Sequence, residues 1–403
     1  MKPSNLELQS WLSEAQSHDY AAILLSNDYA DPYGKFDAVA GFGAKNIFNH
    51  PVEMSDFHGI ALGHISYQFK DHIEHVVHCP SKSKKTTPDF LFFEPLKSIF
   101  ISRDGGREVN GTFELENTLD FNSPCTMGNW IESTTKDKYL EAIDRIRKDI
   151  RNGVYYELNY CISFSTFADL NPYVLFYYFN ELAPSPFAAF YKIKDEFLLC
   201  ASPERFLKKT GNLLISQPIK GTRKRVLGEE ATTIEELKNH PKDLAENTMI
   251  VDLVRNDLSK ICKPASVNVP ELCGIHTFSH VHQMISTVVG EMESGTNFNS
   301  VVSAMFPMGS MTGAPKIEVM KHIDLLEDFT REFYSGSIGY FKGGDFDFNV
   351  VIRSLVYCQN RLTYSVGGAI TYDSIAEEEY EECLTKASGI KSLLAKYPNH
   401  SVK

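Results

Sequence analysis

Residues 217–222 read Gln-Pro-Ile-Lys-Gly-Thr, so that a single lysine, Lys220, lies in a short run between a proline and a glycine. Proline fixes the backbone before this lysine, and glycine permits a tight reversal after it. We therefore expect a rigid turn that holds the Lys220 amine against apolar neighbours. Such burial lowers the pKa of a lysine and makes its amine a nucleophile. A surface lysine beside a turn is the commoner alternative for these six residues alone.

The composition is that of an ordinary globular protein, and the length allows either one large layered domain or two domains. The chain has 403 residues, of which 43% are hydrophobic, and its formal net charge is -12 at pH 7. This negative charge argues against nucleic acid and anionic membranes as partners, although a locally positive site still suits a small anionic substrate. No apolar run has the length of a membrane span or the pattern of a signal peptide, so we expect a cytoplasmic protein.

The cysteines and histidines do not form a recognisable framework. Eight cysteines are scattered without a Cys-x-x-Cys pair, which indicates reduced core thiols. His72, His75 and His78 recur every third residue before Cys79. Zinc sites usually add histidines at wider spacing, and this segment is otherwise polar, so a zinc site is the weaker interpretation.

The order of the expected elements favours an α+β fold over a doubly wound parallel sheet. Expected strands include 20–25, 60–69 and 90–93, and expected helices are 135–151, 235–255, 317–326 and 377–394. Strands that come as antiparallel hairpins, with helices between groups, are typical of α+β proteins. We predict a β-rich N-terminal part, residues 1–135, packed against a core of residues 136–403.

Two pairs of carboxylates have the three-residue spacing of a helix face. Asp243 and Glu246 share one face of the first long helix, and Glu379 and Glu382 share one face of the last. An all-oxygen set suits Mg²⁺, which keeps several waters and binds an anionic group of the substrate. Each pair taken by itself is more often a solvated helix surface.

Other features suit a carboxylated substrate. Arg353 lies within the apolar run 350–355, where we expect a strand in which an unpaired charge is costly and a carboxylate is a good partner. The backbone N–H groups of 367–369, Gly-Gly-Ala, are open to an anion. Glu204 follows the apolar run 197–200 and is suited to act as an acid once desolvated, although a turn or capping role is equally consistent.

Six motifs in order carry a resemblance to a known family. They are Ser-Pro-Glu-Arg-Phe (202–206), Pro-Ile-Lys-Gly-Thr (218–222), Ala-Glu-Asn through Asp-Leu-Val-Arg-Asn-Asp-Leu (245–258), Gly-Ser-Met-Thr-Gly-Ala-Pro-Lys (309–316), Tyr-Ser-Gly-Ser-Ile-Gly-Tyr (334–340) and Gly-Gly-Ala-Ile (367–370). Together they resemble the chorismate-utilising enzymes, which include anthranilate synthase component I, aminodeoxychorismate synthase component I and the isochorismate and salicylate synthases. The resemblance covers residues 136–395. It implies a large two-lobed fold of stacked antiparallel sheets flanked by helices.

Within this family, the lysine indicates the branch. Anthranilate synthases carry alanine where this chain has Lys220, whereas aminodeoxychorismate synthases carry lysine, and residues 29–37 are also similar to the latter branch. The resemblance implies that Lys220 attacks C2 of chorismate, and that Glu204 acts as acid and base at the departing C4 hydroxyl. Ammonia then enters at C4 and gives 4-amino-4-deoxychorismate for folate synthesis. Because we find no Cys-His-Glu glutaminase unit, we expect a separate glutamine amidotransferase subunit to deliver the ammonia.

The resemblance also implies the rest of the site. Glu246 and Glu382 would hold Mg²⁺ against the ring carboxylate, with Asp243 and Glu379 in the outer shell. The implied substrate-binding residues are Thr222, Ser310, Tyr334, Arg353, Gly367, Gly368 and Ala369.

Two departures from the family pattern concern the side from which nitrogen enters. The histidine of many relatives aligns with Gln283, and His282 is its neighbour, which in a regular element points elsewhere. Ammonia-using relatives usually carry glutamine at Glu157, and water-using isochorismate synthases carry a lysine base there. A carboxylate is expected to orient ammonia by a hydrogen bond, or to attract ammonium.

Two other functions stay open. Anthranilate synthase component I is the nearest alternative, but its regulatory tryptophan pocket includes a Leu-Leu-Glu-Ser run, and this chain has Leu-Leu-Ser-Asn at 24–27. A non-catalytic chorismate-binding protein of the same family is the second alternative. The intact Lys220 and Glu204 disagree with it, because a binding module needs no nucleophile and acid together.

Overall fold

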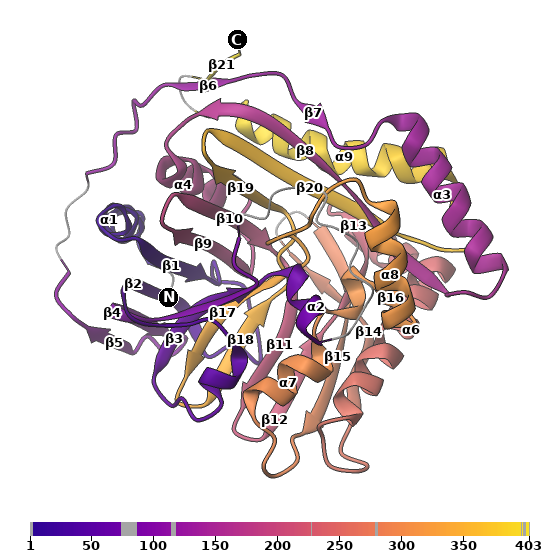
Figure 1. Ribbon diagram of the computed structural model, residues 1–403, viewed down its shortest axis with the longest axis horizontal. Coiled ribbons are helices and arrows are strands. Elements are labelled where there is room, and N and C mark those ends of the chain that lie inside the picture. The colour runs from indigo at the N-terminus through magenta and orange to yellow at the C-terminus, as the bar shows by residue number, and fades with distance from the viewer. Residues whose placement is uncertain are drawn as a thin grey trace.

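The strand β4 (Phe90–Ser102) is the junction of the sheet, because both arms of the sheet start from strands that pair with it. Its first residues pair with β3 (Ile60–Ile65), and most of its length pairs with β2 (Phe36–Phe48). Two arms of antiparallel strands leave from this junction (Figure 1). The computed structural model describes residues 3–73, 87–113, 118–226, 228–278, 281–395, 397 and 400–402.

The first arm leaves β2 and ends at the strand that begins with Glu157. Its order is β1 (Tyr20–Leu25), β9 (Phe187–Ile193), β10 (Glu196–Ser202), β19 (Ser354–Cys358), β20 (Arg361–Ile370) and β8 (Glu157–Asp169). Every strand in this arm is antiparallel to the next. The short strand β16 (Gly313–Ala314) pairs with the start of β8.

The second arm leaves β3 and ends at the strand that carries Lys220. Its order is β17 (Ser337–Lys342), β18 (Asp345–Asn349), β11 (Arg205–Thr210), β12 (Leu213–Gln217) and β15 (Val281–Glu291), and β15 also pairs with β13 (Ile219–Lys224) and β14 (Asn268–Thr277). The stacked sheets expected from the sequence are thus two arms of one connected network, and the α+β class is as predicted.

Short strands complete the sheet at its margins. They are β5 (Arg107–Asn110) on β4, β6 (Cys125–Met127) and β7 (Ile131–Glu132) on β8, and β21 (His400–Val402), which pairs in parallel with β6. Strands from the N-terminal third enter both arms, since β1 pairs with β9 and β3 pairs with β17.

Helices cover the two arms from outside. They are α1 (Asn5–Gln16), α2 (Lys70–Ile73), α3 (Lys136–Arg151), α4 (Pro172–Leu182), α5 (Glu230–Asn239), α6 (Pro241–Ser259), α7 (Phe298–Met305), α8 (Lys316–Leu326) and α9 (Ala376–Leu394), with 3-10 turns at Pro51–Met54, Tyr67–Phe69 and Gly309–Met311. In Figure 1, α9 lies along β20 and β8, beside α3. The helix α6 packs on β13 and β15, so each arm has a long helix near its end.

Two expectations about helices need correction. The single helix expected at 235–255 is two helices, because Pro241 has no N–H to donate and forces His240 into an extended conformation (φ -74°, ψ 114°). The helix α1 was not expected at all. Its start is fixed by Ser4 and Glu7, which cap each other's backbone N–H groups, and its own Trp11 is buried in the core.

The apolar core follows the two arms. One buried cluster lies around β8, β10 and β20 under α1, α3, α4 and α9, and a second lies around β11 and β18 under α6 and α7. The seven described cysteines are free thiols, and Cys79, His75 and His78 lie outside the described residues. His72 pairs with Asp89 through Nε2 and Oδ2, 2.9 Å apart. No helix in the described part of the chain is long and apolar enough to cross a membrane.

Candidate active site

The ends of the two arms meet at an ion pair between Lys220 and Glu157. Lys220 lies in β13 of the second arm, and Glu157 is the first residue of β8 in the first arm. Lys220 Nζ donates to Glu157 Oε1 at 2.9 Å. Glu157 is fully buried, and Lys220 is only 9% exposed. The pair therefore joins two elements whose sequences give no local sign of their contact.

The surroundings of Lys220 differ from those that the sequence predicts. The lysine lies in a strand rather than a turn, and the left-handed backbone belongs to Gly221 (φ 85°), where the pairing of β13 with β15 is irregular. Its wall is acidic rather than apolar. Burial by itself lowers the pKa of Lys220, but the charges of Glu157 and Glu246 outweigh it, so that the pKa is raised. The resting amine is therefore an ammonium ion at neutral pH.

Glu204 lies in the connection from β10 to β11, where the chain passes from the first arm to the second. It is 4% exposed, and Ser310 Oγ donates to its Oε1 at 2.7 Å. Burial raises the pKa of Glu204 to about 7, against the opposing effects of the Ser310 hydrogen bond and the Lys220 charge. A small cavity beside the two side chains is also lined by Pro218 and Met308. The Glu204 carboxyl can therefore hold a proton near neutral pH next to open space.

Arg353 is not in a strand, contrary to the prediction. It lies in the connection between β18 and β19, has a φ of 50°, and is exposed. The sequence misleads here because Val350 and Val351 are buried although they form a connection. Within the described residues, no side chain accepts a hydrogen bond from the Arg353 guanidinium. It is thus available to an anion, and its charge favours the ionised form of Glu204.

Residues 367–369 lie in β20, paired with β8 on one side. On the other side β19 begins at Ser354, so among the described strands none continues along that edge. A side chain at Gly367 would come within 2.4 Å of Cys161 Sγ, and one at Gly368 within 3.3 Å of Glu379 Oε2. The glycines therefore permit the close packing of β20 against β8 and α9, and they leave a backbone edge open as expected.

The other implied substrate residues lie around this centre. Tyr334 is buried, with its hydroxyl 3.9 Å from Cys161 Sγ. Thr222 is exposed in β13, and its Oγ1 accepts a hydrogen bond from Gln283 Nε2 at 3.4 Å. His282 instead bonds to Thr277 of β14, 2.9 Å from Nδ1 to Oγ1. The structure thus brings Gln283, rather than His282, to a residue of the implied substrate pocket.

The four carboxylates of the implied magnesium site lie on α6 and α9, and each has a cationic neighbour. Lys242 Nζ is 3.2 Å from Glu379 Oε1 and 3.9 Å from Glu246 Oε1, so one lysine links the two helices. Lys386 pairs with the exposed Glu382 at 2.7 Å. The fourth pair joins Arg223 to Asp243 at 2.7 Å. Sequence reasoning missed Lys242, although it precedes Glu246 by four residues, the spacing of helix neighbours.

The donor chemistry at this place fits a hard cation. All four candidate ligands are carboxylates, and Glu246 Oε1 is buried without a hydrogen-bond partner among the described residues. Burial raises the pKa of Glu246 to about 7. No three metal-ligating side chains in the described part of the chain stand close enough together to form a ligand set as they are. Lysine ammonium groups balance these charges in the structure.

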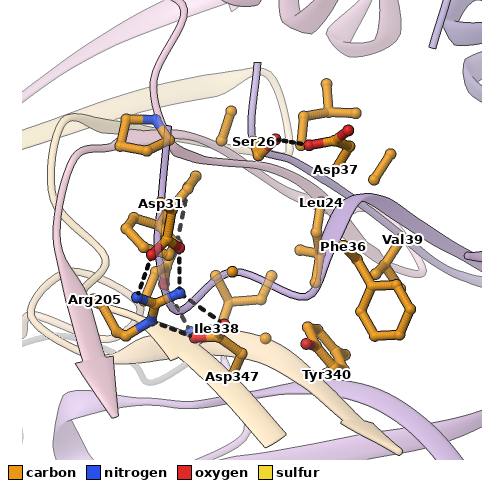
Figure 2. Close-up of a pocket in the computed structure, with 18 of the residues that line it drawn as sticks. Leu24, Ser26, Asp31, Phe36, Asp37, Val39, Arg205, Ile338, Tyr340 and Asp347 are labelled. Carbon is orange, nitrogen blue, oxygen red and sulfur yellow. Dashed lines mark hydrogen bonds and ion pairs between the residues drawn. The ribbon is translucent and has the colours of Figure 1, made fainter. Parts of the chain in front are cut away.

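A second cavity, of about 60 Å³, is lined by Arg205 and by residues of β1 and β2 (Figure 2). Its wall includes Leu24, Leu25 and Ser26. Figure 2 shows Arg205 between two carboxylates, with Arg205 Nη2 2.6 Å from Asp31 Oδ2 and Arg205 Nε 2.8 Å from Asp347 Oδ1. The run at 24–27 singled out in the sequence therefore borders a cavity whose charged residues are paired with one another.

Comparisons with known proteins show the family and agree with the fold. The family model of the chorismate binding enzymes matches residues 13–392. Aminodeoxychorismate synthase component 1 of Bacillus subtilis (strain 168) is 33% identical over 373 residues, with 86% of this chain and 78% of that protein covered. The chain belongs to the chorismate-binding enzyme family, which confirms the resemblance found in the sequence.

Solved structures confirm the fold. The anthranilate synthase component I of Streptococcus pneumoniae TIGR4 superposes with a TM-score of 0.78 at 23% identity, covering 90% of this chain and 93% of that one. The menaquinone-specific isochorismate synthase MenF of Escherichia coli superposes with a TM-score of 0.79 at 17% identity, covering 96% and 91%. Proteins with different reactions thus share this fold, so the choice of reaction depends on the side chains of the site.

Proposed function

We propose that this chain aminates chorismate at C4 with ammonia and forms 4-amino-4-deoxychorismate, the precursor of p-aminobenzoate. One observation carries the proposal: the buried amine of Lys220 lies among carboxylates, within electrostatic reach of Glu204, an acid whose pKa burial raises to about 7. The similarity to aminodeoxychorismate synthase component 1 supports the same reaction. Anthranilate synthase component I is the second candidate function, and the presence of Lys220 disfavours it.

The first half of the reaction replaces the C4 hydroxyl by a bond to lysine. The neutral Lys220 amine forms a bond to C2, and the ring electrons shift along the two double bonds until the bond between C4 and oxygen breaks. Glu204 gives its proton to the departing oxygen, so that water leaves. A carboxyl that is still protonated near neutral pH is suited to this step.

The second half reverses the shift of electrons. Ammonia forms a bond to C4, the ring electrons return to their first positions, and the bond between C2 and the Lys220 nitrogen breaks. The carboxylate of Glu204 takes a proton from the new C4 nitrogen and is again an acid. Lysine is thus regenerated, and the sum is chorismate and ammonia to 4-amino-4-deoxychorismate and water.

The anionic groups of chorismate require positive partners. We assign Arg353 and Tyr334 to the enolpyruvyl carboxylate, and the remaining pocket to Thr222, Ser310, Gly367, Gly368 and Ala369. Mg²⁺, when bound, supplies positive charge that neutralises the ring carboxylate. Glu246 and Glu382 would hold it, with Asp243 and Glu379 behind them, after Lys242 and Lys386 move aside.

Of the three residues expected on the nucleophile side, Gln283 and His282 are assigned to the entry of ammonia, and Glu157 contacts Lys220. The name of the Bacillus subtilis relative, aminodeoxychorismate synthase component 1, implies a second component. We propose that a glutamine amidotransferase subunit supplies ammonia to this chain.

The test is the product profile of the purified chain with chorismate, Mg²⁺ and ammonium salts, resolved by chromatography. We expect 4-amino-4-deoxychorismate, with little turnover when glutamine replaces ammonium, and no product from Lys220→Ala. Anthranilate as the main product would favour the second candidate. Isochorismate, or salicylate with pyruvate, at a comparable rate without ammonium would contradict the assignment of the reaction.

A further inference from the structure

We propose that Glu157 is the catalytic base that takes the proton from Lys220 as this lysine attacks the substrate. The inference rests on the proposed function, because it assumes that Lys220 is the nucleophile. It adds what that function leaves open, which is how an amine that is an ammonium ion in the resting site becomes able to react.

The geometry places the acceptor in direct contact with the reacting atom. An ammonium ion has no lone pair, so a proton has to leave Lys220 Nζ before the nitrogen bonds to carbon. Glu157 Oε1 lies 2.9 Å from Nζ, which is hydrogen-bond distance. Both side chains are buried, at 1% and 9% side-chain exposure, so bulk water is a poorer acceptor than this carboxylate.

The other carboxylates near Lys220 have other partners or proposed roles. The carboxylates that act on its charge are Glu157 from β8, Glu204 from the connection between β10 and β11, Glu246 from α6 and Glu382 from α9. Glu204 accepts the hydrogen bond of Ser310, and its own proton is needed at the leaving oxygen. Glu246 and Glu382 are assigned to the cation. Among the described residues, Glu157 is the ion-pair partner of Lys220.

Proton transfer from Lys220 to Glu157 is favoured when the substrate is bound in this buried site. The pair has no net charge either as ammonium and carboxylate or as amine and carboxylic acid. When substrate displaces water, a buried environment penalises the separated charges and favours the neutral form. Glu157 Oε2 has no hydrogen-bond partner among the described residues, and Glu157 Oε1 accepts its hydrogen bond from Lys220.

The protons balance over the whole cycle. The proton moves from Lys220 Nζ to Glu157 Oε1, and the nitrogen lone pair then forms the bond to C2. When ammonia enters at C4 and the bond between C2 and the lysine nitrogen breaks, the proton returns from Glu157 to Lys220. Glu204 handles the separate proton that goes to the leaving oxygen and comes back from the C4 nitrogen. Glu157 therefore exchanges a proton with the Lys220 nitrogen, and Glu204 exchanges a proton with the groups that leave and enter at C4.

The experiment follows formation of the covalent adduct in a single turnover. Wild-type chain and Glu157→Gln are mixed with chorismate and Mg²⁺ without ammonia, quenched, and analysed by intact mass, with Lys220→Ala as the blank. We expect Glu157→Gln to form the adduct about 100-fold more slowly near neutral pH, the usual contribution of a general base. Because both proteins keep the Glu204 acid, its titration affects them equally, and the ratio of the variant rate to the wild-type rate should rise with pH as solvent takes over the proton of Lys220.

The opposite result has a distinct meaning. If Glu157 only stabilises the ammonium ion, its removal lowers the pKa of Lys220 and the variant reacts as fast as the wild type or faster, which would overturn the proposal. A second variant, Glu157→Ala, leaves space for a small carboxylate, so added formate should restore adduct formation in proportion to its concentration. Lack of rescue in a folded Glu157→Ala protein also counts against the base. A wild-type chain that forms no adduct overturns the nucleophile itself, and with it the role of Glu157.

Discussion

Arg205 and Lys220 are both buried cations, but they differ in how many of their hydrogen-bond donors have acceptors. Every nitrogen of the Arg205 guanidinium has an acceptor, from Asp31, Asp347 and Gln217. Lys220 has one ion-pair partner among the described residues, Glu157, whose second oxygen has no partner there. Arg205 lines a cavity, whereas Lys220 lies among acidic groups where the two arms meet.

The difference teaches where to look for chemistry in this molecule. A fully satisfied buried cluster stabilises one arrangement, because moving any member leaves a charge unpaired. A buried pair with hydrogen-bonding capacity to spare can exchange a proton or accept a new bond without that penalty. Saturation of hydrogen bonds, rather than burial, distinguishes Arg205 from Lys220, the cation that we propose is reactive. The following predictions test this separation.

The largest effect is expected at the reactive cation. Lys220→Ala should lower kcat/KM for ammonia-dependent amination to below about one-thousandth of wild type, because the covalent bond is lost. Urea denaturation should also show some loss of stability, because Glu157 is left buried without its ion-pair partner. Wild-type activity in this variant, together with an unmodified wild-type protein after incubation with chorismate, would show that Lys220 is not the nucleophile.

The carboxylates assigned to the cation come next. Glu246→Gln and Glu382→Gln should each lower the Mg²⁺-dependent rate by about 100-fold, because an amide does not compensate the charge of a hard cation. Glu378→Gln, at an exposed position of α9, is the control and should keep its activity. Full activity of the wild type in excess chelator would contradict the magnesium assignment.

The structural cluster should respond in stability and not in chemistry. Asp347→Asn removes a carboxylate that binds both Arg205 and Lys208, and it should lower the free energy of unfolding by about 3 kcal/mol. The turnover number per folded molecule should stay close to that of the wild type. Asp345→Asn, two residues away and more exposed, is the matched control for urea denaturation. A loss of turnover without a loss of stability would reverse the roles of the two regions.

The Glu204 carboxyl should make both kcat/KM and the free energy of unfolding depend on pH. Burial raises its pKa to about 7, so kcat/KM should fall about tenfold per pH unit above this value as the proton needed by the leaving oxygen is lost. The folded protein also holds this proton more tightly than the unfolded chain, so the contribution of Glu204 to stability should be lost as the pH rises from 4.5 to about 7. Glu204→Gln should remove that contribution from the pH dependence of unfolding. A rate that is flat through this range would argue against Glu204 as the acid.

The smallest effect concerns Lys242, the lysine between the two helices. Lys242→Met removes an ammonium group that lies beside Glu379 and Glu246, so Mg²⁺ should bind about two- to fivefold more tightly, as calorimetry can measure. Lys238→Met, on the exposed surface of α5, serves as the control. Weaker binding in Lys242→Met would mean that this lysine supports the cation site instead of competing with it.

Local patterns predicted the elements whose causes are local. The helix α3 begins after Thr135, which caps it, and α8 and α9 lie where the periodicity places them. Glu204 and Ser310, which the family resemblance assigns to the same site, lie 2.7 Å apart. Helices and motifs are both defined by residues close together in the sequence, so they can be predicted from it.

What the sequence did not reveal depends on contacts between distant segments. The acidic wall of Lys220 comes from Glu157 on another arm, so six residues around the lysine suggested an apolar turn and a lowered pKa. Arg353 lies in a connection rather than a strand because β18 and β19 belong to different arms, although Val350 and Val351 have the composition of a strand. The end of α5 before Pro241 is the exception. Its cause is local, but the prediction of one helix at 235–255 followed the apolar periodicity and overlooked the proline.

The two-armed sheet also sets the order in which the enzyme can become active during synthesis. Glu157 and Lys220 are 63 residues apart, and Asp31 and Arg205 are 174 residues apart, so their contacts form only after long loops have closed. The carboxylates of α9 are added last, after both arms exist. A nascent chain on the ribosome therefore carries helices and hairpins well before it carries a reactive centre. Turnover should begin abruptly once the last helix docks, without a partly active intermediate.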